Sequence, residues 1–328
     1  MTVSRVINDE GNVRPATRDA VNAAIAELKY QPNSAARTLA GAGQNRIGLL
    51  YSNPSAGYLS EFLVGGLDQA SRRDVQIVVE TCDLGDHEIE VARHLIEGGV
   101  DGIILPPPLC DSPELIRLLT EEQVCAVLVG SAKPAAELLA VSIDDRRAAL
   151  ELTQHIIGLG HRRIGFIGGN ASLQASAERL AGYREALEEA GLPFEEALVA
   201  PGLFTYRSGL DAAEQLLALG EAPTAIFASN DDMAAATVAV AHRRGLDVPG
   251  DLTVCGFDDT TLATAIWPEL TTIHQPIADM SRAAVEMLVA AIRRQGSQLE
   301  PRHQLLDFTL IRRQSDAAPR RRPRALGT

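Results

Sequence analysis

From residue 46 onward, short apolar runs alternate with amphipathic stretches, and this alternation constrains the fold more than any other feature. Nine runs have the length of buried strands, among them RIGLLYS, GIILPPP and TAIFASN. The segments between them carry apolar residues at helical spacing, as in AERLAGYREALEEAG, and several end in glycine. Strand–helix alternation at intervals of about 25 to 30 residues is typical of βαβ units in a parallel sheet.

Nine strands are many for one compact sheet in a chain of 328 residues. We therefore predict an α/β fold with two doubly wound parallel-sheet subdomains, divided near residue 144. Ligands of open parallel sheets bind beyond the carboxyl ends of the strands, and small polar residues stand at those ends here: Ser52-Asn53, Ser229-Asn230-Asp231 and Asp258-Asp259. Two facing subdomains would place them on both sides of one cleft, which suits a small polar ligand.

The composition indicates a globular protein, with 46% hydrophobic and 22% charged residues. The sequence contains neither an apolar run of eighteen residues nor the apolar segment of a secretory signal, so we expect a cytoplasmic protein. Cys82, Cys110, Cys125 and Cys255 form no Cys-x-x-Cys pair. We interpret them as reduced core thiols, with metal ligation as the alternative.

The net charge of −13 disfavours nucleic-acid contacts over the whole surface, but the charge is unevenly distributed. Residues 1–46 carry +2 and residues 312–328 carry +5, which leaves −20 on residues 47–311. Electrostatic attraction between basic side chains and DNA phosphates is short-ranged in physiological salt. The negative charge of residues 47–311 is therefore compatible with DNA contacts that are confined to residues 1–46. The closing DAAPRRRPRALGT lacks apolar periodicity, which predicts disorder.

No set of catalytic residues emerges from the motifs. The sequence contains no Gly-x-Ser-x-Gly elbow, no phosphate loop ending in Gly-Lys-Ser/Thr and no His-Glu-x-x-His. Asp258 and Asp259 could act as an acid–base pair, but no nucleophile or metal ligand lies near them in the sequence. We predict a protein that is not an enzyme and has no cofactor or metal; an enzyme on a doubly wound fold is one alternative.

The first 40 residues have a sequence pattern that predicts helices. TVSRVIN resembles the second helix of a helix-turn-helix, with its apolar positions facing a core and Thr2, Arg5 and Asn8 facing a DNA groove. The segment PNSAARTLAG predicts a short helix with a single large apolar residue, Leu39. A lone leucine there suits a wedge between base steps in the minor groove.

Several segments in order resemble one family. They are TVSRVIN, ATRDAVNAAIAELKYQPNSAARTLAG, GHRRIGFIGG, ERLAGYREAL, PTAIFASNDDMAAA, LTVCGFDDT, PELTTIHQP and LIRRQS. The chain is similar to the lactose-repressor/galactose-repressor family of bacterial transcriptional regulators from residue 2 to about 315. The resemblance implies a DNA-reading head, a hinge helix and an effector-binding core like that of periplasmic sugar-binding proteins. It also implies a homodimer, or a dimer of dimers, on pseudo-palindromic operator DNA.

The resemblance also assigns roles to individual residues. DNA contacts fall on Thr2, Ser4, Arg5, Asn8, Asn33, Ala36 and Leu39. Effector contacts fall on Arg179, Phe204, Asn230 and Asp258, and we add Asn53 and Tyr58 on the side of the first subdomain. Arg, Asn and Asp would give directional hydrogen bonds to hydroxyl groups, while an aromatic ring packs on a sugar ring. Asn230 and Asp231 could instead cap the helix that begins there.

The predicted organisation follows from these matches. It comprises a partial helix-turn-helix head (1–31), a hinge helix and linker (32–45), a core (46–316) and a disordered basic tail (317–328). Within the core, the first subdomain takes about 46–144 and 275–303, and the second about 145–274 and 304–316. Met1 stands where the recognition helix is already under way, so we expect a truncated head or a misplaced start.

The predicted function is a DNA-binding transcriptional regulator, with repression as the expected mode. Its small polar effector is expected to be a sugar or sugar derivative that alters the closure of the two subdomains and thereby the pairing of the hinge helices. The cleft residues alone also fit a sugar phosphate or a nucleobase. The main alternative is a sugar-binding module that has lost DNA binding.

Overall fold

The structure is a computed structural model that describes residues 44–82, 87–293 and 303–320, together with residues 14, 17 and 85. The predicted DNA-contacting residues, the recognition helix and the hinge helix lie outside the described residues. The core, from residue 45 on, forms one compact unit of the chain. None of the helices in the described segments is long and apolar enough to cross a membrane.

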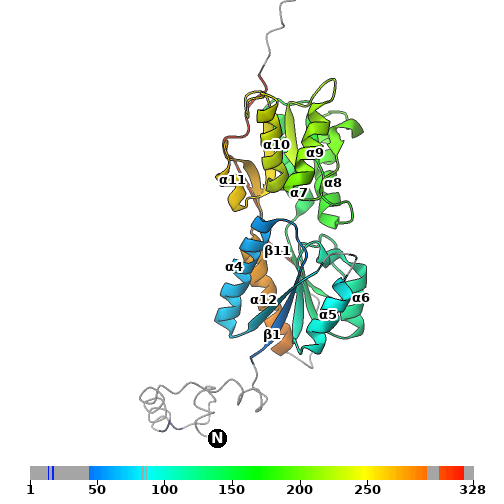
Figure 1. The fold of residues 1–328 in the computed structure, drawn as a ribbon, viewed down its shortest axis with the longest axis vertical. Coiled ribbons are helices and arrows are strands. Elements are labelled where there is room, and N and C mark those ends of the chain that lie inside the picture. Colours follow the sequence, from blue (N-terminus) through cyan, green and yellow to red (C-terminus); the bar gives the residue numbers. More distant parts are fainter. Residues whose placement is uncertain are drawn as a thin grey trace, which may run out of the picture. The chain divides into compact units, whose positions relative to one another are not determined.

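The first subdomain is built on a sheet that is parallel throughout, with strand order β11-β5-β4-β3-β1-β2. Its strands are β1 (Arg46–Tyr51), β2 (Gln76–Thr81), β3 (Gly102–Leu105), β4 (Cys125–Val129), β5 (Leu139–Ser142) and β11 (His303–Leu305). Its helices are α4 (Ala56–Arg73), α5 (Glu88–Glu97), α6 (Pro113–Glu121) and α12 (Ile277–Arg293), with the 3-10 turn η1 (Leu109–Asp111). Helices α4 and α12 cover one face of the sheet, and α5 and α6 cover the other (Figure 1).

The second subdomain repeats this plan with the order β12-β10-β9-β8-β6-β7, in which only β12 is antiparallel to its neighbour. Its strands are β6 (Ile164–Ile167), β7 (Val199–Ala200), β8 (Ala225–Ala228), β9 (Thr253–Asp258), β10 (Thr271–His274) and β12 (Thr309–Ile311). Its helices are α7 (Asp145–Gly158), α8 (Gln174–Glu189), α9 (Tyr206–Leu217), α10 (Asp231–Arg243) and α11 (Thr261–Ala265), with the 3-10 turn η2 (Glu196–Leu198). The predicted pair of doubly wound sheets is confirmed.

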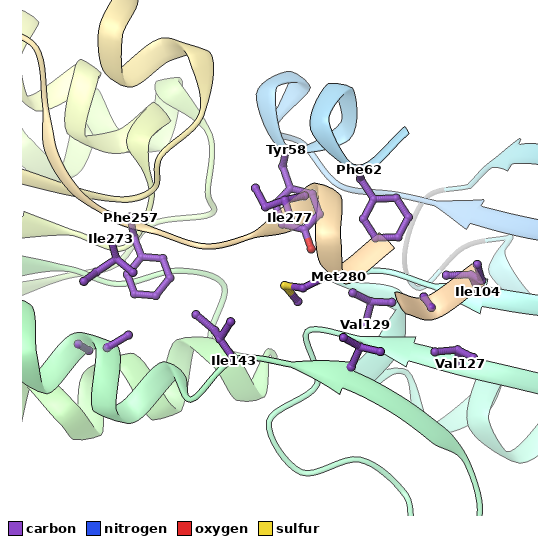
Figure 2. Packing of buried hydrophobic residues seen from close by; sticks show 14 of the residues in the cluster. Tyr58, Phe62, Ile104, Val127, Val129, Ile143, Phe257, Ile273, Ile277 and Met280 are labelled. Atoms are coloured by element: carbon purple, nitrogen blue, oxygen red, sulfur yellow. The ribbon is translucent and has the colours of Figure 1, made fainter. Parts of the chain in front are cut away.

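Successive side chains along a strand point to opposite faces of its sheet, and because they are apolar here, each sheet has an apolar layer on both faces. In β6, Phe166 packs in the cluster shared with α7, while the next residue, Ile167, packs in the cluster shared with α9 and α10. The chain crosses between the subdomains three times: between β5 and α7, between β10 and α12, and between β11 and β12. Figure 2 shows that one buried cluster is continuous across this junction, with Phe257 and Ile273 on one side and Phe62 and Ile104 on the other.

The start of the predicted disordered tail is ordered, which corrects that prediction for residues 317–320. The Thr253 hydroxyl and a ring nitrogen of His161 both lie within hydrogen-bond distance of the Ala317 carbonyl, at 3.0 and 2.8 Å. The Ala317 N–H donates back to the Thr253 hydroxyl, and Arg320 pairs with Asp247. These hydrogen bonds between the Ala317 backbone and the side chains of Thr253 and His161 hold the segment, although its composition is that of a disordered chain.

Candidate functional site

A cavity of about 310 Å³ opens between the two subdomains, at the carboxyl ends of both sets of strands. This volume lies at the lower end of the range for small-molecule sites. All six residues that the sequence suggested as effector ligands line it: Asn53, Tyr58, Arg179, Phe204, Asn230 and Asp258. The structure therefore brings these residues together, and their role as ligands stays a prediction.

Arg179 of α8 lies at the centre of the polar part of this cavity and is only 5% exposed. Its Nε donates to Asp145 at 2.8 Å, and its Nη1 donates to the Ser229 carbonyl at 2.5 Å. Its Nη1 also lies 3.9 Å from a carboxylate oxygen of Asp258. The guanidinium carbon lies 3.6 Å from the ring centroid of Phe257, so the aromatic ring packs against one face of the guanidinium group. Together, these contacts fix the orientation of the Arg179 side chain.

Two buried carboxyl groups accompany this single cation. Burial raises the pKa of Asp145 and raises that of Asp258 well above its ordinary value, and Arg179 offsets part of both shifts. Asp258 also adopts a φ of 106°, a backbone conformation that side chains other than glycine rarely take. Among the residues that line the cavity, Arg179 is the only cation, so the site offers no surplus of positive charge.

Asn230 has two functions in the fold. Its side-chain oxygen accepts from the Met233 N–H at 3.0 Å and caps α10, which confirms the capping interpretation for this residue. Its amide nitrogen donates to the Phe204 carbonyl at 3.0 Å. Asp231 does not cap the helix. Its carboxylate is buried and accepts from Thr260 and Thr272, and burial raises its pKa to about 7.

The Phe204 ring occupies space that a side chain at position 169 would take. A Cβ on Gly169 would lie 2.0 Å from Cζ of Phe204, so any larger residue at this position would force the ring to move. Phe204 itself has a φ of 59°, in the left-handed region. The Gly168-Gly169-Asn170 turn after β6 thus makes room for an aromatic wall of the cavity.

The wall from the first subdomain contains a polar group that lacks a partner. Tyr58 is 4% exposed, and its hydroxyl makes no hydrogen bond within the described residues. Burial is the main reason why its pKa is raised well above the ordinary value. An unsatisfied buried hydroxyl costs about 1–3 kcal/mol. Asn53 differs, because its side-chain oxygen already accepts from the Ser55 N–H at 2.9 Å in the turn before α4.

Asp145 and Gln275, which both lie beside Arg179, are among the lining residues that the sequence interpretation missed. Asp145 follows β5 at the first crossover, and Gln275 follows β10 at the second. The run AVSIDD places acidic residues after a strand as LTVCGFDD does, and this signal could have indicated Asp145. Gln275 has no such signal, because its place beside Arg179 at 3.5 Å depends on the path of the crossover.

Comparisons with known proteins identify the family. A family model of periplasmic-binding-protein-like domains matches residues 153–315, and one of bacterial regulatory proteins of the lacI family matches residues 1–33. HTH-type transcriptional regulator CelR of Thermobifida fusca is 37% identical over 321 residues, which is 96% of this chain and 94% of the relative. Catabolite control protein A of Priestia megaterium is 36% identical over 289 residues, 88% of this chain and 87% of the relative. The chain belongs to the LacI family.

Solved structures extend the similarity to the LacI-family core. A transcriptional regulator CelR–cellobiose complex superimposes with a TM-score of 0.77 at 34% identity, covering 95% of this chain and 94% of the other. The transcription regulator CcpA of Lactococcus lactis gives 0.76 at 26% identity, covering 83% and 99%. The LacI-family assignment confirms the predicted family and the predicted function as a transcriptional regulator. The seven predicted DNA contacts at positions 2, 4, 5, 8, 33, 36 and 39 stay predictions, because they lie outside the described residues.

Proposed function

We propose that this LacI-family protein is an operator-binding repressor whose DNA affinity is set by a neutral sugar in the cleft. The observation that carries the proposal is the cavity shared by both subdomains, with Arg179, Asn230 and Asp258 on one wall and the unpartnered hydroxyl of Tyr58 on the other. A sugar hydroxyl both donates and accepts, so it can pair with all of these groups.

The charge and shape of the cavity favour a neutral ligand over a sugar phosphate. A phosphate needs surplus positive charge, but Arg179 is already paired with Asp145 and lies close to Asp258. The remaining walls are apolar, with Leu173 and Phe204 beside the polar groups, and they suit the non-polar face of a sugar ring. The CelR relative was solved with cellobiose, which makes cellobiose the first probe.

The sugar would act by favouring closure of the cleft. A ligand that contacts both walls would stabilise the closed arrangement, and we propose that the two subdomains move as units about the three crossovers that join them. Coupling free energies between two such sites are typically about 1–3 kcal/mol. We propose that this coupling changes the operator affinity of the head and that the protein acts in the cytoplasm.

We also propose that the protein acts as a homodimer through α4 and β2. Val64 and Leu67 of α4 are 61% and 53% exposed, and Val79 of β2 is 43% exposed. Large apolar side chains that are exposed on adjoining elements favour a protein–protein contact. Replacing Val64 and Leu67 with glutamate should convert a dimer into monomers in sedimentation experiments, and a wild-type monomer would contradict this proposal.

The experiment has two arms on the full chain. Isothermal titration would compare cellobiose, other neutral mono- and disaccharides and their phosphates, and we expect binding of a neutral sugar that Arg179→Ala abolishes. Selection from random duplex DNA, followed by fluorescence anisotropy at fixed salt, should then yield a pseudo-palindromic site. Binding of sugar without any selected DNA would instead support the sugar-binding module. Binding of only the phosphates would contradict the proposed ligand class.

A further inference from the structure

Helix α8, which carries Arg179, begins without a cap of its own. Its N-cap residue is Leu173, whose side chain makes no capping hydrogen bond. Five other helices around the cleft begin with a side chain that accepts from their own first turn: Ser55 for α4, Ser112 for α6, Asp144 for α7, Thr205 for α9 and Asn230 for α10. The first amide groups of α8 therefore need an acceptor from elsewhere.

Asp111 of the other subdomain supplies this acceptor. Its Oδ2 accepts from the Gln174 N–H, the first amide of α8, at 2.9 Å. Its Oδ1 accepts from the Ser131 hydroxyl at 2.8 Å, so the carboxylate is held by its own subdomain while it reaches across the cleft. A carboxylate at a helix N-terminus also interacts favourably with the helix dipole.

A second segment of the first subdomain contacts the same helical turn. The Lys133 N–H donates to the side-chain oxygen of Gln174 at 2.6 Å, and the Lys133 ammonium lies 2.8 Å from a carboxylate oxygen of Glu178. The first turn of α8 is therefore held at three points by residues that belong to the opposite subdomain. All three contacts exist only while the cleft is closed at this rim.

We infer that Asp111 is a positioning residue that caps α8 across the cleft, so that closure orders the helix that orients Arg179. Arg179 lies five residues after Gln174, little more than one helical turn from the cap. A sugar bound at Arg179 and the cap at Gln174 then favour the same closed arrangement, and each strengthens the other. The link to the sugar rests on the proposed function, whereas the capping itself does not.

The opposite rim of the cleft shows a different arrangement. There the Ser55 hydroxyl donates to Asp232 of α10 at 2.7 Å, but both helices already have caps, Ser55 for α4 and Asn230 for α10. Opening this rim breaks one hydrogen bond and leaves both helix starts satisfied. Opening the Asp111 rim leaves a helix start unsatisfied, so closure has a local structural consequence on one side only.

Amide hydrogen exchange of the full chain without ligand tests the capping directly. We expect Asp111→Ala to speed exchange in peptides covering 174–178 by about five-fold, which is the usual size of a lost N-cap. Asp111→Asn keeps an acceptor oxygen for the Gln174 N–H and should stay within about two-fold of wild type. Glu114→Ala, which removes an exposed carboxylate of α6, is the matched control and should leave α8 unchanged.

The location of the effect separates this role from a purely structural one. If Asp111 only stabilised its own loop, Asp111→Ala would speed exchange around residues 105–115 and leave 174–178 at the wild-type rate, which would overturn the inference. Equal acceleration in the alanine and asparagine variants would overturn it as well. In the second arm, the neutral sugar found by titration should bind Asp111→Ala several-fold more weakly and bind Asp111→Asn normally. Failure of every sugar to bind would overturn the proposed function, and the exchange data would still decide the capping.

Discussion

Arg179 and Asn230 on one wall of the cleft differ from Tyr58 on the other in how completely their polar atoms are satisfied by the fold. On the wall of the second subdomain, Arg179 and Asn230 are each fixed by hydrogen bonds within the fold. On the wall of the first subdomain, the Tyr58 hydroxyl is buried and has no hydrogen-bond partner among the residues that the structure describes. We therefore expect the wall with Arg179 and Asn230 to be organised in advance and to orient a ligand, and we expect the Tyr58 hydroxyl to gain a hydrogen bond when a ligand binds.

The largest expected effect comes from removing the centre of the organised wall. Arg179→Ala deletes the donors for a sugar and leaves Asp145 and Asp258 buried beside each other without their cation. We expect sugar affinity to fall by at least about 100-fold, equivalent to about 2.7 kcal/mol, in isothermal titration. Arg179→Lys should recover only part of this loss because it keeps the charge but not the planar fork. Wild-type sugar affinity in the alanine variant would show that Arg179 does not contribute to ligand binding.

A second variant disturbs the aromatic part of the same wall without touching a polar group. Gly169→Ala places a methyl group against the Phe204 ring and forces the ring to move. We expect about a ten-fold loss of sugar affinity, since a displaced ring loses its packing on the ligand. Gly158→Ala is the matched control, because nothing lies within 4 Å of a Cβ at that position. Equal affinities in the two variants would remove Phe204 from the binding surface.

Tyr58→Phe tests the unsatisfied wall. The hydroxyl makes no hydrogen bond within the described residues, so its removal should raise the free energy of unfolding, by up to about 1–3 kcal/mol. Sugar affinity should fall by about five-fold as one ligand hydrogen bond is lost. Denaturant unfolding and titration together check both parts. A clear loss of stability with unchanged affinity would mean that the hydroxyl serves the fold, which would erase the contrast between the walls.

The smallest expected effect is a change of stability with pH, and it comes from Asp231, which lies behind the wall of the second subdomain. Burial raises the pKa of Asp231 from 3.8 to about 7. Between about pH 4 and pH 7, the Asp231 carboxyl is therefore protonated in the folded protein and ionised in the unfolded chain. Stability contributed by this group is therefore present below pH 4 and is lost as pH rises to about 7. Asp231→Asn can still accept from Thr260 and pair with the Thr272 hydroxyl.

The measurement for Asp231 is the change in Tm between pH 5 and pH 8. Wild type should lose more stability over this interval than Asp231→Asn does, since the asparagine has no proton to release. Parallel pH profiles for the two proteins would show that Asp231 does not titrate in this range.

The sequence predicted most of the fold because its signals are local. All nine apolar runs are strands, and each contains four to six consecutive strand residues. The missed strands β7, β11 and β12 contain only two or three residues each and depend on a neighbouring strand for their hydrogen bonds. Residues 317–320 were misjudged for the same reason, because their partners Thr253 and His161 lie far away in the sequence.

The site was predictable where residues follow strands or match family segments, and not where it depends on the path of the chain. Arg179 and Asp258 were found in this way, but Gln275 lies on a crossover with no local pattern. The Asp111–Gln174 contact joins residues 63 positions apart, in different subdomains. No periodicity in the sequence encodes such a contact, because it requires two separately folded units to meet.

We propose above that a sugar in the cleft controls the operator affinity of the protein. The most direct test is anisotropy of a selected operator with the full chain, with and without saturating neutral sugar, in wild type and Arg179→Ala. We expect the sugar to change operator affinity of wild type by about 5- to 150-fold, the range for typical coupling free energies. The variant should keep the ligand-free affinity and show no change with sugar. Sugar that binds wild type in the cleft and leaves its operator affinity unchanged would contradict the claim.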